Sequence, residues 1–173
     1  ATSHVNTEQI DPRKYNSTFV AIVFRQSVQN VVSIPKTKQY DIGFVRKAKA
    51  EELSAVEELF AAFQSELYRG EKDPLSPDAL VVDIPSSERY PLKLPEEKNL
   101  FGALWYEILP EDIFYVAHLY VRPEARKFGL GRKLVEEGLE TAFSFGCSKI
   151  ELRAPEDVVP FYRKLGFKPY ARN

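Results

Sequence analysis

The sequence predicts a single mixed α/β domain, in which helices cover a largely antiparallel central sheet. Two observations support this prediction. Residues 100–108 and 113–122 are rich in strand-forming side chains and are separated by residues 110–112, which indicates an antiparallel hairpin. After the hairpin, helical and strand patterns alternate to the end of the chain. The length of 173 residues fits one domain with an additional arm.

Two segments have the periodicity of amphipathic helices. In residues 49–68 and again in residues 129–145, apolar side chains recur at spacings of three and four, which places them on one face. Gly146 follows the second segment, at a position where glycine commonly ends a helix. A third, short helix is predicted at residues 161–165.

The remaining apolar segments are predicted strands. They are residues 18–24, 42–45, 79–84, 149–153 and the segment around 167–170. Residues 79–84 could instead form the end of a short helix that begins at Ser76. Residues 18–24 are apolar, β-branched and aromatic, as in a strand that is buried on both faces. We therefore divide the chain into an N-terminal arm, residues 1–40, and a domain, residues 41–173. The strand of the arm could complete the sheet of its own chain or that of a partner in a homodimer.

The composition excludes several classes of function. Lys and Arg total 24 and Asp and Glu total 25, so the near-neutral chain is not expected to coat nucleic acid. Cys147, the single cysteine, cannot form an internal disulfide or a cysteine-based zinc site, and two histidines suggest no metal centre. No apolar run approaches the length of a membrane span, and residues 1–16 lack a signal core. We expect a cytoplasmic protein, with an organelle after processing left open.

The segment from residue 121 to residue 133 combines glycines with positive charge at a predicted helix start. Gly129 and Gly131 leave backbone N–H groups bare, so that a phosphate can approach them closely. The bases of this segment are Arg122, Arg126, Lys127, Arg132 and Lys133. The loop therefore suits a pyrophosphate. It lacks the Gly-Lys-Ser/Thr of a Walker loop, and Leu134 stands where the dinucleotide fingerprint requires a third glycine.

Together with their flanks, these residues resemble the GNAT superfamily of N-acetyltransferases. The resemblance rests on Leu119–Pro123, on Arg126-x-x-Gly129-x-Gly131 and on Phe161–Phe167, with Phe44–Ala48 and Phe101–Leu104 similar to the family's first and third strands. It covers about residues 42–170. It implies a GNAT-like fold and an N-acyltransferase that takes an acetyl or longer acyl group from acetyl-CoA or another acyl-CoA.

The resemblance also implies which residues hold the donor. The backbone of Leu119, Tyr120 and Val121 would pair with the pantetheine arm, and the pyrophosphate would lie on N–H groups of Arg126, Lys127, Phe128, Gly129, Leu130, Gly131 and Arg132. Tyr162 would be the general acid that protonates the departing CoA thiolate. The alternative for Tyr162 is a packing role or a hydrogen bond to the thioester sulfur.

The general base is left open between three side chains. Ala117 stands where related diamine-type enzymes carry Glu, and His118 is adjacent to it. Neighbouring strand residues face opposite ways unless a bulge intervenes, so the orientation of His118 depends on the local register. Tyr115, acting through a water molecule, and Glu107 on the preceding strand are the other candidates.

Two departures from the family pattern keep other functions open. Pro155 occupies the place of an Asn that usually touches the cofactor, and the chain stops soon after residue 170, where relatives usually continue into a further strand. The alternatives are a long-chain acyltransferase with a carrier-bound donor and a CoA-binding regulatory module without turnover. Cys147 is not expected to act as a nucleophile, because nothing in its neighbourhood would activate the thiol.

The charge distribution favours a cationic acceptor. Residues 50–90 hold ten acids and three bases, whereas residues 122–173 hold eleven bases and seven acids. An acidic acceptor side would attract a small-molecule amine or a basic peptide. Much of this charge could equally belong to the solvated face of the helix at 49–68. No membrane or nucleic-acid partner is expected.

Overall fold

The computed structural model describes residues 18–22, 42–67, 78–86, 89, 94, 98–154 and 156–170, which form one seven-stranded sheet with flanking helices. The strand order is β2-β3-β4-β5-β6-β1-β7. The strands are β1 (Thr18–Ile22), β2 (Phe44–Lys47), β3 (Asp78–Asp83), β4 (Leu100–Leu109), β5 (Ile113–Val121), β6 (Lys149–Arg153) and β7 (Lys168–Tyr170). All neighbouring strands are antiparallel except β5 and β6, which are parallel. The predicted fold class is confirmed.

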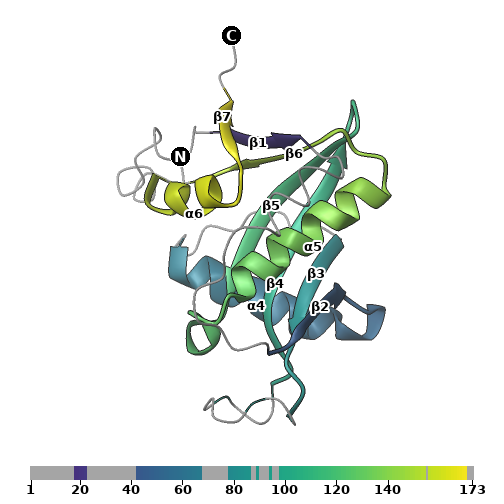
Figure 1. The fold of residues 1–173 in the computed structure, drawn as a ribbon. Helices are drawn as coiled ribbons and strands as arrows, with labels where there is room; N and C mark the ends of the chain where they lie inside the picture. The colour runs from purple at the N-terminus through teal and green to yellow at the C-terminus, as the bar shows by residue number, and fades with distance from the viewer. Residues whose placement is uncertain are drawn as a thin grey trace, which may run out of the picture.

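Two long helices cover opposite faces of the sheet. Helix α5 (Leu130–Ser144) crosses the front of the sheet in Figure 1, and α4 (Leu53–Leu67) lies behind it. Helix α6 (Val159–Lys164) precedes β7. Short 3-10 turns, Ala50–Glu52, Pro123–Ala125 and Glu156–Val158, lead into the three helices or lie just before them.

The side chains of β4 alternate between two hydrophobic clusters, one under each helix. Leu104 and Tyr106 pack on the α5 side with Leu134 of that helix. Trp105 packs on the α4 side with Leu59. This alternation follows from the two-residue period of a strand, and it explains why a strand buried on both faces is apolar along its length.

The strand of the N-terminal arm lies inside the sheet of its own chain. Val20 of β1 pairs with Glu151 of β6 on one side and with Lys168 of β7 on the other. Within the described residues, β1 is the pairing partner through which β7 joins the sheet. The expected strand at 18–24 is thus found at 18–22, and residues 23 and 24 lie outside the described part. The division into arm and domain, and a homodimer, stay predictions.

Several boundaries differ by a few residues from the sequence prediction, and two of these differences have a local cause. The strand expected at residues 42–45 begins at Phe44, because Gly43 has a φ of +69°, a left-handed conformation that does not fit a strand. The helix expected at 161–165 begins at Val159, with Pro160 in its first turn. Proline is tolerated there because a first-turn N–H has no partner within the helix.

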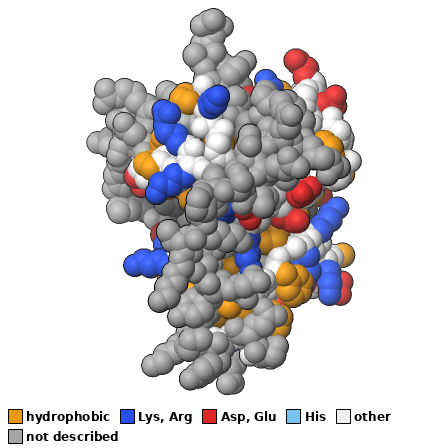
Figure 2. Space-filling model, in the orientation of Figure 1, with side chains coloured by type: hydrophobic (Ala, Val, Ile, Leu, Met, Phe, Trp, Pro, Cys, Tyr) orange, Lys and Arg blue, Asp and Glu red, His pale blue; other side chains and the backbone are white. Residues whose placement is uncertain are grey.

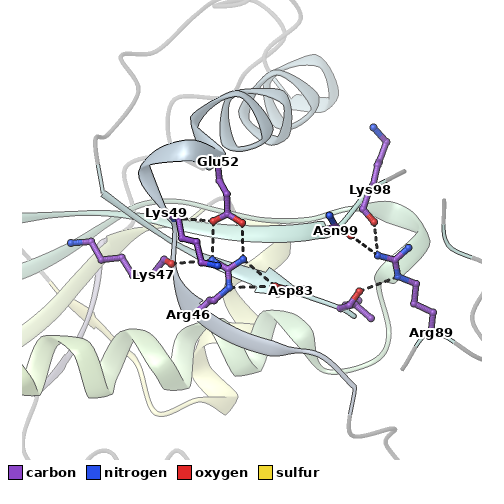
Figure 3. A network of polar contacts seen from close by, with 9 residues as sticks. Arg46, Lys47, Lys49, Glu52, Asp83, Arg89, Lys98 and Asn99 are labelled. Carbon is purple, nitrogen blue, oxygen red and sulfur yellow. Dashed lines mark hydrogen bonds and ion pairs between the residues drawn. The ribbon is translucent and has the colours of Figure 1, made fainter. Parts of the chain in front are cut away.

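Polar side chains tie the loops of the β2–β3–β4 edge to the sheet (Figure 3). Arg46 of β2 donates to both carboxylate oxygens of Glu52, at 2.7 and 2.8 Å, and to Asp83 of β3 at 3.0 Å. The buried Arg89 donates to the carbonyl of Ile84 at 3.0 Å and to that of Lys98 at 2.6 Å, and it lies over the ring of Phe101. The two contacts of Arg89 satisfy backbone carbonyls on the connection that leads into β4.

On the face shown in Figure 2, basic, acidic and hydrophobic side chains of the described residues are interspersed. Among the helices of the described part, none is long and apolar enough to cross a bilayer.

Candidate active site

The sheet opens where β5 and β6 separate. The two strands pair from Ile113 to Val116 of β5, and β5 then continues to Val121 while β6 diverges from it (Figure 1). A bulge coincides with this point: Trp105 of β4 pairs with His118, but Tyr106 pairs with Val116, so Ala117 is the extra residue. A bulge increases the local twist, which is consistent with the divergence of β5 from β6.

The predicted phosphate loop leads from the freed end of β5 into α5. Its backbone turns sharply, with φ of +73° at Lys127 and +78° at Gly129, the N-cap of the helix. Glycine adopts such angles without penalty, whereas they are strained for lysine. No side chain caps the helix start, and the first N–H groups of a helix have no partner within it. The loop thus presents the positive end of the helix dipole to the opening.

A groove of about 610 Å³ lies between the end of β5, the loop, α6 and the end of α4. Its predicted lining residues are Leu119, Tyr120, Val121, Arg126, Lys127, Gly129, Leu130, Gly131 and Arg132. Phe128 is not among the lining residues and packs instead against the hydrophobic cluster on the α5 side. The loop and the strand predicted to hold the donor therefore meet in one groove.

The groove also has residues that the sequence did not single out. They are Phe63, Glu66, Ala125, Asp157 and Val158. Glu66 follows Phe63 by three residues and so lies beside the apolar face of α4, which is the signal that could have identified it. Phe161, which the sequence analysis names only as part of the family motif, also lines the groove, and a Cβ added at Gly131 would lie 3.5 Å from its ring.

The positive charges of the groove are partly neutralised within the protein. Arg126 contacts both carboxylate oxygens of Glu66, at 2.9 and 3.0 Å, and its guanidinium lies over the ring of Tyr120. Arg132 donates to Glu136 at 3.0 Å, one turn further along α5. Lys127 is exposed. In the described part of the chain no cluster of His, Cys, Asp and Glu is suited to hold a metal ion.

Tyr162 is not among the residues that line the groove, although its neighbour Phe161 is. Its side chain is buried in the cluster on the α5 side, and its ring packs edge-on against Phe161 and Phe167. Burial raises the pKa of its phenol above the usual value of 10, so the hydroxyl is protonated at neutral pH.

The three candidate bases occupy different environments. The ring of His118 lies 5.0 Å from that of Phe63, a groove residue, and 5.2 Å from that of Phe60. Ala117 packs against the same cluster, so the bulge places both neighbours toward α4. Tyr115 pairs with the exposed Glu107 of β4 and with Glu151 of β6. It therefore lies near the hairpin turn, where β5 is still paired on both sides.

Cys147 is buried between α5 and β6. Burial, with a smaller effect of Asp112, raises the pKa of its thiol. The thiol is therefore not activated as a nucleophile.

Comparison with known proteins assigns the fold to a family. The model of the family described as "Acetyltransferase (GNAT) family" matches residues 53–167. A glucosamine 6-phosphate N-acetyltransferase of Trypanosoma brucei brucei is 38% identical over 58 residues, which are 34% of this chain and 40% of that protein. The match thus spans less than half the length of this relative.

Solved structures of acetyltransferases share the architecture. A GCN5-related N-acetyltransferase from Kribbella flavida has a TM-score of 0.57 at 16% identity, over 88% of this chain and 53% of its own. An acetyltransferase from Trypanosoma brucei has a TM-score of 0.54 at 22% identity, over 76% of this chain and 96% of its own. An aminoglycoside acetyltransferase from an uncultured soil metagenomic sample has a TM-score of 0.54 at 16% identity, over 77% and 91%. With the family model covering most of the sheet, both long helices and the glycine loop, the chain belongs to the acetyltransferase (GNAT) family.

Proposed function

We propose that this protein is an N-acyltransferase that moves an acetyl group from acetyl-CoA to an amine by direct attack in a ternary complex. The observation that supports the proposal is the groove itself. The freed end of β5, the uncapped start of α5 and two glycines converge on one opening. Its volume of about 610 Å³ is in the range of small-molecule sites.

The donor would bind through its diphosphate and its pantetheine arm. The N–H groups at the start of α5 and the basic side chains of the loop suit the diphosphate. A Cβ at Gly131 would lie 3.5 Å from the ring of Phe161, another residue of the groove lining, and would narrow the groove at that point. The backbone of Leu119 to Val121 has no β6 neighbour and would accept the extended arm, as a strand edge accepts an added strand.

In the transfer, the amine forms a C–N bond with the acyl carbon, the C–S bond breaks, and the CoA thiolate takes up a proton. Tyr162 is the proposed proton donor. Thiols titrate near 8.5, and burial raises the pKa of Tyr162 above the usual phenol value of 10, so the proton transfer is energetically uphill and depends on close geometry. A backbone N–H near Leu119 would polarise the carbonyl oxygen.

The amine has to be neutral when it attacks, and His118 is the base that we propose. It lies beyond the bulge and next to Phe63, whereas Tyr115 and Glu107 lie toward the hairpin turn. The acceptor is proposed to be a cationic amine. Glucosamine 6-phosphate belongs in the acceptor screen because one relative is named for it.

The experiment that tests this proposal compares two glycines of the same helix. Calorimetric titration with acetyl-CoA is carried out on the wild type, on Gly131→Ala and on Gly138→Ala. A Cβ at Gly138 meets Leu104 at 3.4 Å, Phe114 at 3.8 Å and Ile150 at 4.0 Å, away from the groove, so both substitutions add a methyl group without a severe clash. We expect Gly131→Ala to weaken binding about tenfold, or about 1.4 kcal/mol, and Gly138→Ala to leave it unchanged.

Tyr162→Phe then separates catalysis from binding. We expect acetyl transfer to an amine panel to fall by about 10²-fold or more, while the affinity for acetyl-CoA is preserved. If Tyr162→Phe retains full turnover, Tyr162 has only a packing role. If the wild type binds longer acyl-CoAs but not acetyl-CoA, the acyl group is longer. If it binds CoA species and acetylates no amine, the protein is a binding module.

A further inference from the structure

The contact between Glu66 and Arg126 crosses the donor groove. Glu66 lies at the end of α4 and Arg126 at the start of the phosphate loop, and both line the groove. The Nη2 atom of Arg126 lies 3.0 and 2.9 Å from the two carboxylate oxygens of Glu66. The Tyr120 hydroxyl donates to the same carboxylate at 3.4 Å. The contact therefore links the acidic helix to the part of the chain that would hold the donor.

Arg126 is held in the loop independently of Glu66. Its Nε donates to the carbonyl of Val121 at 2.8 Å, and its guanidinium lies over the ring of Tyr120, 5.5 Å from the centroid. The guanidinium group of Arg126 therefore stays at the groove when the Glu66 carboxylate is replaced by another anion. The guanidinium side chain is 41% exposed and the carboxylate side chain 40% exposed, and an ion pair of this kind is weak in water. A diphosphate carries more negative charge than a carboxylate and can take the same guanidinium with two parallel hydrogen bonds.

We propose that the donor's diphosphate displaces Glu66 from Arg126, and that the released carboxylate then binds the ammonium group of the acceptor. This inference rests on the proposed function and adds to it the contact that the donor would displace and the carboxylate that would hold the cationic amine. Asp157 is the other acid of the groove, but it lies across from α4 in the turn before α6. Glu66 is thus the carboxylate on the α4 side. By linkage, the acceptor in turn increases the affinity for the donor.

The donor half is tested with Glu66→Gln, with CoA and with pantetheine, which lacks the diphosphate. We expect Glu66→Gln to bind CoA about two- to fivefold more tightly, because a competitor for Arg126 is removed, and to bind pantetheine unchanged. Glu58→Gln is the matched control. Glu58 lies on the same helix and contacts Lys98 and Arg122, each at 2.8 Å, but it does not line the groove. This control should change neither affinity.

Arg126→Ala completes a double-mutant cycle. In that background, Glu66→Gln should no longer affect the affinity for CoA, because the group for which the two anions compete is absent. Thermal unfolding of Glu66→Gln should match that of the wild type, since the pair is half exposed. An unchanged CoA affinity in Glu66→Gln, or an equal gain for pantetheine, overturns the displacement.

The acceptor half is tested by acetyl transfer to tyramine, glucosamine, glucosamine 6-phosphate and a lysine peptide. For the amines that turn over, Glu66→Gln should raise the KM of the amine about tenfold without raising the KM of acetyl-CoA. An unchanged amine KM, or CoA binding without turnover of any of the four, overturns the acceptor role. Failure of the wild type to bind any CoA species contradicts the proposed function itself and is thereby distinguished from a failure of this inference.

Discussion

Gly102 is the position at which a single methyl group should disturb both the sheet and the site. It is a buried residue of the central strand β4, where it pairs with Val82 of β3 on one side and with Val121 of β5 on the other. A Cβ built on Gly102 would lie 2.8 Å from the carbonyl oxygen of Tyr120 and 3.3 Å from the Cα of Val121. Both contacts are with the backbone of β5, so a change of side-chain rotamer cannot relieve them.

The cost follows from the need to move a strand. Introducing a methylene-sized group into a well-packed interior costs about 1–3 kcal/mol. For a domain of this size, 1 kcal/mol corresponds to about 2–4 °C in Tm, so Gly102→Ala should lower the Tm by about 2–12 °C. Tyr120 and Val121 line the groove, so the displacement of β5 should also weaken acyl-CoA binding.

Urea unfolding and acetyl-CoA titration of Gly102→Ala measure the two effects. Gly138→Ala is the control, because its Cβ meets only side-chain atoms, at 3.4 Å or more. We expect a lower unfolding midpoint with an unchanged slope in Gly102→Ala alone. A variant as stable as the wild type would refute the predicted clash. A destabilised variant with unchanged affinity would show that β4, rather than β5, moves.

Two further predictions concern the outer strands of the sheet. Val20→Pro removes an N–H from β1, which is paired on both sides, so it should destabilise the protein by about 1–3 kcal/mol and increase hydrogen exchange in β7 and α6. In the control Val20→Ala, these two elements should remain as protected from exchange as in the wild type. Unchanged protection in Val20→Pro would contradict the place of β1 between β6 and β7. Arg46 lowers the pKa of the Glu52 carboxyl from 4.5 to about 2, chiefly by hydrogen bonding, so this stabilisation is present above pH 4.5 and is lost as the pH falls toward 2. Arg46→Gln should therefore show a smaller loss of unfolding free energy between pH 5 and pH 2, and an equal loss in both proteins would contradict the assignment.

The sequence alone was sufficient for the elements that depend on neighbouring residues. The spacing of apolar side chains in α4 and α5 and the turn between β4 and β5 are local properties, and the structure confirms these elements. The glycine loop was recognised in the same way, because Gly129 and Gly131 are adjacent in the sequence to basic residues and to a helical pattern. This combination indicates a phosphate-binding loop. Local pattern could not place the start of β2, since the left-handed conformation of Gly43 is set by its surroundings.

Contacts between distant segments were decided by the tertiary structure. The pattern of residues 18–24 indicated a strand, but only the pairing with β6 and β7 placed it between them. The sequence left the direction of His118 open, because it depends on the register between β4 and β5, and the bulge at Ala117 decided it. The position of Glu66 beside the apolar face of α4 is visible locally, but its contact with Arg126, 60 residues along the chain, is not. Helix periodicity and turn chemistry act over a few residues, whereas strand order, register and ion pairs across a groove depend on how the whole chain packs, and the site of this protein lies where those long-range contacts meet.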